Sequence, residues 1–136
     1  MTEIKKLTKI AILAYGGVSL IFGILLVFLT DIFLATLNMP TWQNPAHPRM
    51  FGAALFLVTI FALLVLLHKD WDWEKIKFAY EILYLWAPIN IIIEASVMAI
   101  NFPLLSTEVI FETILDITIM IVLLIIGIVA YIKQRS

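Results

Sequence analysis

Four long apolar stretches dominate this sequence and leave it few ways to fold. They cover residues 10–29, 50–67, 78–100 and 109–132. Each is close to the 20 or so apolar residues that a helix needs to cross a hydrocarbon core of about 30 Å. Because spanning helices satisfy their own backbone groups, and the stretches lack the alternation of barrel strands, we expect four transmembrane helices. The predicted fold is therefore all-α, a polytopic membrane protein forming one up-and-down four-helix bundle over residues 1–136.

The composition also favours lipid as the surrounding medium. The chain is 63% hydrophobic and 14% charged, whereas a soluble domain has about 45–50% apolar and about 25% charged residues. A chain of 136 residues cannot bury that much apolar surface internally. The net charge of −1 gives no basic surface for nucleic acid, and the absence of cysteine excludes disulfides and cysteine metal sites. The expected partner is the lipid bilayer.

The basic residues predict the orientation. Arg49 lies on one side of the four predicted spans. The opposite side holds Lys5, Lys6, Lys9, Lys69, Lys75, Lys77, Lys133 and Arg135. Because lysine and arginine mark the cytoplasmic face, we expect both chain ends in the cytoplasm and the protein in the cytoplasmic (plasma) membrane. The first apolar stretch is longer than the core of a signal peptide, so it is interpreted as a retained helix.

The third and fourth stretches carry polar residues at helical spacing. The third holds Asn90, Glu94 and Asn101, and the fourth region holds Glu108, Glu112 and Asp116. Spacings of four and seven residues place each set on one helix face. Ser106 is a suitable N-cap for the fourth helix. The short connection makes the two helices antiparallel neighbours, with Glu94 about 10 Å and Asp116 about 12 Å inward from it. These two carboxylates are therefore predicted to lie at similar depth and to face each other.

Carboxylates inside a span suggest a binding site. Each charge costs about 2.5–3.5 kcal/mol at the centre of a span, so these side chains should face the bundle interior or a watered cavity. We predict an outward-facing ligand or ion site, with Arg49 as counter-ion, that binds or transports a cation, a proton or a small cationic ligand. Its predicted residues are Asp31, Arg49, Asn90, Glu94, Asn101, Glu112 and Asp116. The alternative is a structural pair in which Arg49 joins Glu94 or Asp116 and fixes helix packing.

The sequence predicts no catalytic residue, metal site or cofactor, and enzyme activity is not expected. His47 and His68 should lie on opposite faces of the membrane, so they cannot share a metal. The first helix carries small residues at Gly16, Gly17, Ser19 and Gly23. Small side chains favour close helix packing, either within the chain or between subunits. Trp71 and Trp73 flank two spans and are expected in the interfacial belt.

The first half of the chain resembles small DoxX-like four-helix membrane proteins. The resemblance covers about residues 10–68: the turn Thr30-Asp31-Ile-Phe-Leu, an outer loop with Pro40, Pro45 and Pro48, and the segment Arg49-Met-Phe-Gly52. It implies a four-helix bundle and a redox-associated role, since such proteins include subunits linked to quinone-dependent sulfur oxidation. No catalytic residue follows from it. A structural or accessory subunit of a larger membrane complex remains an alternative, and a homo-oligomer is expected because four helices are few for a transporter.

Overall fold

The computed structural model describes residues 2–38 and 46–136, and the regular elements within them are all helices. They are α1 (Lys6–Phe28), α2 (Thr30–Thr36), α3 (Ala46–Leu67), α4 (Trp73–Asn101), the 3-10 helix η1 (Phe102–Leu104) and α5 (Thr107–Arg135). The helices α1, α3, α4 and α5 are long and apolar enough to cross a membrane. The prediction of four such helices is confirmed. Pro40 and Pro45 of the predicted outer loop lie outside the described residues.

Two helix starts are fixed by side-chain caps. The carboxylate of Asp72 accepts a hydrogen bond from the Lys75 N–H at 3.1 Å, so α4 begins at Trp73 and includes a polar turn ahead of its apolar stretch. The hydroxyl of Ser106 accepts from the Val109 N–H at 3.3 Å and starts α5, which confirms the predicted N-cap. Hydropathy alone misses such polar turns, because they remain helical without being apolar.

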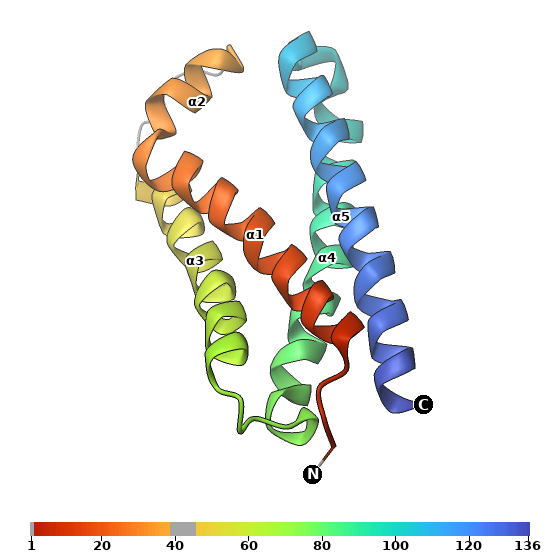
Figure 1. Ribbon diagram of the computed structural model, residues 1–136. Coiled ribbons are helices and arrows are strands. Elements are labelled where there is room, and N and C mark those ends of the chain that lie inside the picture. Colours follow the sequence, from red (N-terminus) through yellow and green to blue (C-terminus); the bar gives the residue numbers. More distant parts are fainter. Residues whose placement is uncertain (1, 39–45) are drawn as a thin grey trace.

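The segment after α1 forms a separate short helix. Helix α1 ends at Phe28, and α2 follows from Thr30, whose hydroxyl donates to the Leu26 carbonyl. Figure 1 shows α2 turning away from the direction of α1. Asn38 has a φ of 52°, a left-handed conformation that asparagine tolerates well and that stops the helical path. The break at Leu29 therefore separates α2 from α1.

The four long helices form two pairs, and one helix of each pair contacts the other pair. Helix α1 packs against α3, α4 packs against α5, and α1 also packs against α5 (Figure 1). Both chain ends and the α3–α4 connection lie at one end of the molecule, which we call the lower end after its place in Figure 1. The α1–α2 and α4–α5 connections lie at the upper end. Which side of a membrane each end faces remains a prediction from the basic residues.

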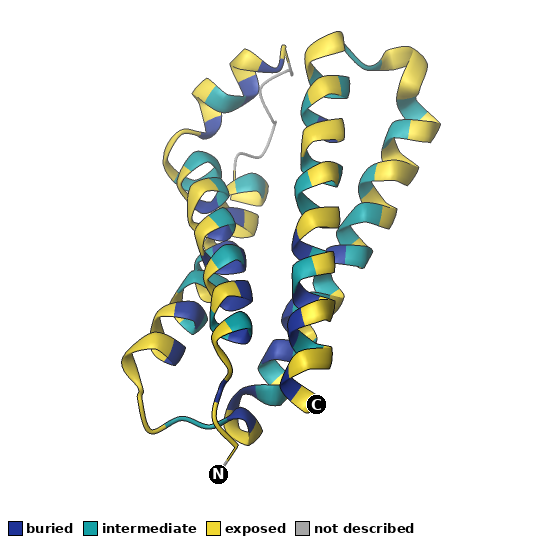
Figure 2. Ribbon diagram, turned by 45° about the vertical axis from the view of Figure 1, so that its right-hand side comes forward, coloured by how far each residue is buried: buried dark blue, intermediate teal, exposed yellow. Residues whose placement is uncertain are grey.

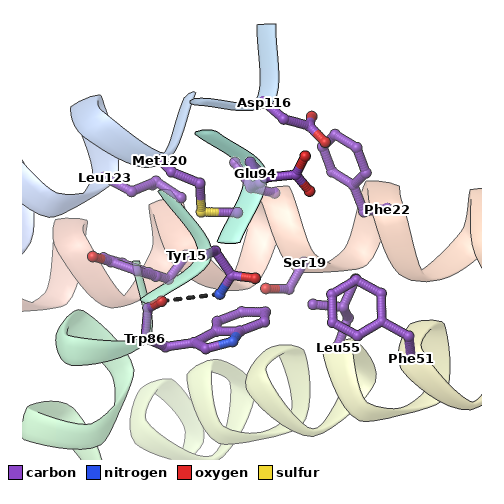
Figure 3. A pocket seen from close by; sticks show the side chains of 12 residues that line it. Tyr15, Ser19, Phe22, Phe51, Leu55, Trp86, Glu94, Asp116, Met120 and Leu123 are labelled. Atoms are coloured by element: carbon purple, nitrogen blue, oxygen red, sulfur yellow. Dashed lines mark hydrogen bonds between the residues drawn. The ribbon is translucent and has the colours of Figure 1, made fainter. Parts of the chain in front are cut away.

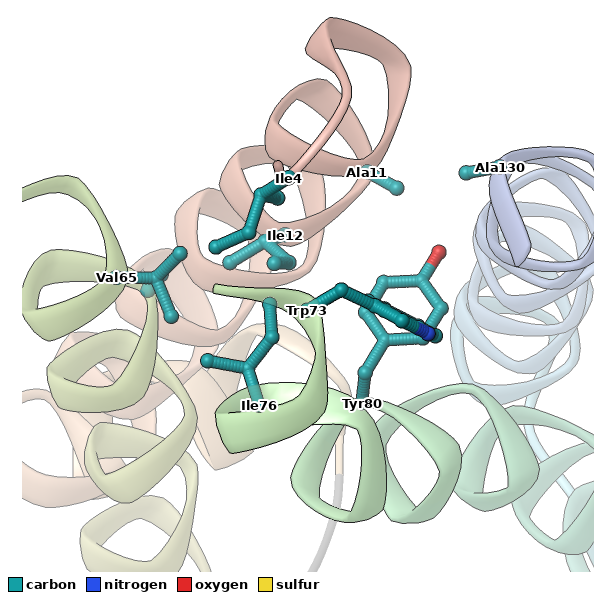
Figure 4. Close-up of a cluster of buried hydrophobic side chains, with 9 residues drawn as sticks. Ile4, Ala11, Ile12, Val65, Trp73, Ile76, Tyr80 and Ala130 are labelled. Atoms are coloured by element: carbon teal, nitrogen blue, oxygen red, sulfur yellow. The ribbon is translucent and has the colours of Figure 1, made fainter. Parts of the chain in front are cut away.

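The largest buried cluster lies at the lower end. Figure 4 shows its aromatic centre, where Trp73 and Tyr80 meet side chains from α1, α3 and α5. The buried members are Ile4, Ala11, Ile12, Ala62, Val65, Trp73, Ile76, Tyr80 and Ala130. Trp73 is only 3% exposed and its backbone N–H donates to the Thr2 carbonyl at 2.8 Å. The N-terminal segment therefore folds back over Trp73 and covers it, and the placement of Trp73 in the interfacial belt stays a prediction.

The outward faces of the four long helices are apolar and exposed. Figure 2 shows exposed residues along the outer side of each helix, and they include Leu57 on α3, Ile92 on α4 and Ile125 on α5, each more than half exposed. Such a surface would be costly in water but has no penalty against hydrocarbon. The arrangement is that of an integral membrane protein in contact with lipid.

Glycines allow α1 and α3 to approach closely. A Cβ atom on Gly16 would lie 2.5 Å from the Cβ of Ala62, and one on Gly52 would lie 3.2 Å from the Gly23 carbonyl oxygen. The hydroxyl of Thr59 on α3 also donates to the Gly16 carbonyl at 3.1 Å. These small residues therefore serve packing within the chain, which is one of the two roles that the sequence left open.

Substitution of Gly16 by alanine is expected to lower the free energy of unfolding by about 1–3 kcal/mol, because the added methyl group forces two helices apart. The measurement is unfolding of the purified protein in detergent. Gly17→Ala is the matched control, since a Cβ there meets no atom within 4 Å. Its stability should stay within about 1 kcal/mol of the parent. Equal stability of the two variants would contradict the close contact.

Candidate functional site

The α4 and α5 helices bring two carboxylates to one place in the upper half of the molecule. Glu94 on α4 and Asp116 on α5 are both half-buried and line the same two cavities between the helices. Figure 3 shows both carboxylates directed toward the ring of Phe22 on α1. Helix α4 and helix α5 are neighbours, so the depth argument from the sequence agrees with the observed positions. The two acids do not point away from the bundle into lipid.

The deeper of the two cavities is small and mostly apolar. Its volume is about 50 Å³, enough for a few water molecules. Its polar lining consists of Tyr15, Ser19, Asn90, Glu94 and Asp116, and its apolar lining of Val18, Phe22, Phe51, Leu55, Trp86, Met120 and Leu123. We call it the inner cavity. It lies between the carboxylates and the aromatic core at the lower end.

A second, larger cavity lies on the other side of the carboxylates, and we call it the outer cavity. Its volume is about 320 Å³. It shares Phe22, Phe51, Glu94 and Asp116 with the inner cavity. The rest of its lining is Leu26, Phe33, Leu34, His47, Pro48 and Glu112. The four shared residues form the boundary between the two spaces, so a molecule in either one touches the carboxylates.

The acids of this region gather at the outer cavity. Glu94, Glu112 and Asp116 all line the outer cavity, so three carboxyl groups border one space. Among the described residues that line the two cavities, His47 is the one side chain that can carry a positive charge. The lining is therefore rich in negative charge, and chemically it suits a cation or a proton.

Three of the predicted site residues lie outside both cavity linings. Arg49 pairs with Asp31, with 4.0 Å between Nη2 and Oδ2, and both side chains are largely exposed. Arg49 is thus placed beside Asp31, and it lines neither cavity. An exposed pair of this kind contributes at most about 1 kcal/mol.

The two predicted asparagines make local hydrogen bonds to their own helix. The side-chain amide of Asn101 donates to the Val97 carbonyl at 2.9 Å, outside the cavities. Asn90 donates to the Trp86 carbonyl at 2.9 Å (dashed line in Figure 3) while lining the inner cavity. Of the predicted set, Asn90, Glu94, Glu112 and Asp116 come together in the structure, and Asp31, Arg49 and Asn101 do not.

The sequence interpretation missed the residues that α1 and α3 contribute. Phe22 and Phe51 border both cavities, and Ser19 lines the inner one. Phenylalanine is common throughout these apolar stretches, so nothing in the sequence distinguishes these two from lipid-facing rings. Ser19 offered a signal, because a hydroxyl within an apolar span needs a polar neighbour.

Comparisons with family models, with curated proteins and with solved structures gave no match. The resemblance of residues 10–68 to DoxX-like proteins therefore remains a prediction from the residues that suggested it.

Proposed function

We propose that this integral membrane protein binds or transports a cation, a proton or a small cationic ligand at Glu94 and Asp116. The single observation that carries the proposal is the position of these two carboxylates. They come from different helices, are half-buried, and line the same cavities within an otherwise apolar bundle. Charged acids at such positions are costly unless a cation, a proton or a paired group neutralises them.

The distribution of basic residues supports an outward-facing site. Lys5, Lys6, Lys133 and Arg135 belong to the chain ends, which lie at the lower end of the molecule. The carboxylates lie nearer the α4–α5 connection at the upper end, away from those residues. With the basic end in the cytoplasm, the outer cavity faces the external side of the membrane.

The proposal is tested by cation titration of the purified protein in detergent. A cation that binds the folded state raises the unfolding midpoint by mass action. We expect a concentration-dependent rise with at least one of Na⁺, Mg²⁺ and tetraethylammonium at constant ionic strength. Glu94→Gln and Asp116→Asn should each weaken the apparent affinity at least tenfold. A pH titration without added cation tests the proton, and its profile should differ between the parent and Asp116→Asn.

Glu108→Gln is the matched control, because Glu108 is an exposed carboxylate on the same helix as Asp116 and borders neither cavity. The unfolding midpoint of this variant should rise with added cation as that of the parent does. An equal cation-dependent rise of the unfolding midpoint in the Glu94→Gln/Asp116→Asn double variant would overturn the proposal.

A further inference from the structure

The size of the outer cavity narrows the class of ligand. Its volume of about 320 Å³ falls in the range of about 300–1,000 Å³ that is typical of small-molecule pockets. The inner cavity, at about 50 Å³, admits only water or a single small ion. A bare inorganic ion at the carboxylates would leave most of the outer cavity without contacts. An organic molecule fills it.

The walls of the outer cavity differ in chemistry. Phe22, Phe33 and Phe51 come from α1, α2 and α3, whereas Glu94, Glu112 and Asp116 come from α4 and α5. Figure 3 shows Phe22 beside the carboxylates of Glu94 and Asp116, with Phe51 on the same side of the cavity. Aromatic faces attract organic cations, and carboxylates neutralise their charge. One ligand that satisfies both walls is an ammonium group carrying alkyl substituents.

The same residues are poorly suited to a metal ion. Among the described residues, no group of three or more histidine, aspartate or glutamate side chains is arranged to hold a metal. Calcium requires six to eight oxygen ligands, and magnesium a near-ideal octahedron. An alkylammonium ion needs no such convergence, because its charge is spread over a larger surface.

A buried hydroxyl lies at the edge of the inner cavity. Tyr15 is 1% exposed, lines this cavity, and its hydroxyl is buried without a hydrogen-bond partner among the described residues. A buried hydroxyl without a partner is unfavourable. A water molecule in the inner cavity that Tyr15 lines would supply a partner.

We infer that the ligand is a small organic ammonium ion, with its cationic group at Glu94 and Asp116 and its alkyl groups against Phe22 and Phe51 in the outer cavity. The inference rests on the proposed function, whose ligand class it specifies. The two sides of the outer cavity contribute differently to binding. The carboxylates bind any cation, whereas the phenylalanines favour an organic cation.

Tetraethylammonium, Na⁺ and Mg²⁺ serve as probes in the same titration of the unfolding midpoint. We expect tetraethylammonium to bind at least tenfold more tightly than either inorganic cation. Phe22→Leu and Phe51→Leu should each weaken its binding about fivefold, since a leucine provides no aromatic face. Phe28→Leu is the matched control, because Phe28 is an exposed ring on the same helix as Phe22 and borders neither cavity. The elution profile in gel filtration verifies that each variant is folded.

The outcomes separate the two proposals. Binding of Na⁺ or Mg²⁺ that depends on Glu94 and Asp116, without binding of tetraethylammonium, overturns the organic ligand and leaves the proposed function standing. Tetraethylammonium affinity that is equal in the parent, Phe22→Leu and Phe51→Leu overturns the aromatic wall. Absence of any cation or proton response overturns both.

Discussion

Replacement of Tyr80 by alanine should lower the free energy of unfolding by about 3–5 kcal/mol. The side chain is fully buried, and its hydroxyl donates to the Gly127 carbonyl at 2.9 Å. Its ring packs against Trp73 with the centroids 5.5 Å apart and against Tyr84 at 6.0 Å. Alanine would leave a cavity at the junction of α4 and α5 and would remove the hydroxyl that bonds to the Gly127 carbonyl. The effect is measured by denaturant unfolding in detergent.

Two variants separate the ring of Tyr80 from its hydroxyl. Tyr80→Phe retains the packing and loses one hydrogen bond, so a loss of about 1 kcal/mol is expected. Phe78→Ala removes a ring that is 74% exposed on the same helix, and its effect should stay within about 0.5 kcal/mol. If Tyr80→Ala proves as stable as Phe78→Ala, the lower-end cluster does not stabilise the fold as described.

The hydropathy of the sequence predicts the four long helices because each apolar stretch matches the thickness of a bilayer. It does not predict where α1 stops, since Leu29 and Thr30 are as compatible with a span as their neighbours. The break there depends on tertiary packing, in which Thr30 and Leu34 become buried. Trp73 illustrates the same limit, because nothing in its local sequence shows that the N-terminal segment covers it.

Helix spacing predicts part of the candidate site for a geometric reason. The rise per residue sets the depth of Glu94 and Asp116 on two helices joined by a short connection, and the structure places both at one cavity boundary. The partner of Arg49 depends on a contact between segments distant in sequence. Close packing of α1 on α3 brings the first turn of α3 beside the first turn of α2, where Asp31 lies. No spacing rule gives that contact.

The uneven packing of the bundle explains why the cavities occur in its upper half. The largest buried cluster holds all four long helices together at the lower end. Above it, the two helix pairs are joined chiefly through α1 and α5, and the space between the pairs is lined by the phenylalanines and the acids. Packing at one end thus leaves the two cavities nearer the other end.

The hydrogen bonds of Gln134 join the two chain ends, and their removal gives the second large expected effect. The side-chain oxygen of Gln134 accepts from the Lys5 N–H and from the Thr8 hydroxyl, each at 2.8 Å, and its amide group donates to the Glu3 carbonyl at 2.8 Å. Gln134 is 3% exposed and Thr8 is fully buried. Gln134→Leu should therefore lower the free energy of unfolding by about 3 kcal/mol, because it leaves buried donors unsatisfied.

A graded set of variants tests that account. Thr8→Val removes one of the three hydrogen bonds and keeps the shape of the side chain, so its loss should be intermediate, about 1 kcal/mol. Ser136→Ala removes an exposed hydroxyl at the same chain end and should change little. Denaturant unfolding ranks the three, and hydrogen exchange should show faster exchange at Lys5 in Gln134→Leu. An unchanged exchange rate there would show that the N-terminal segment is held by other contacts, with its Trp73–Thr2 backbone hydrogen bond the next to examine.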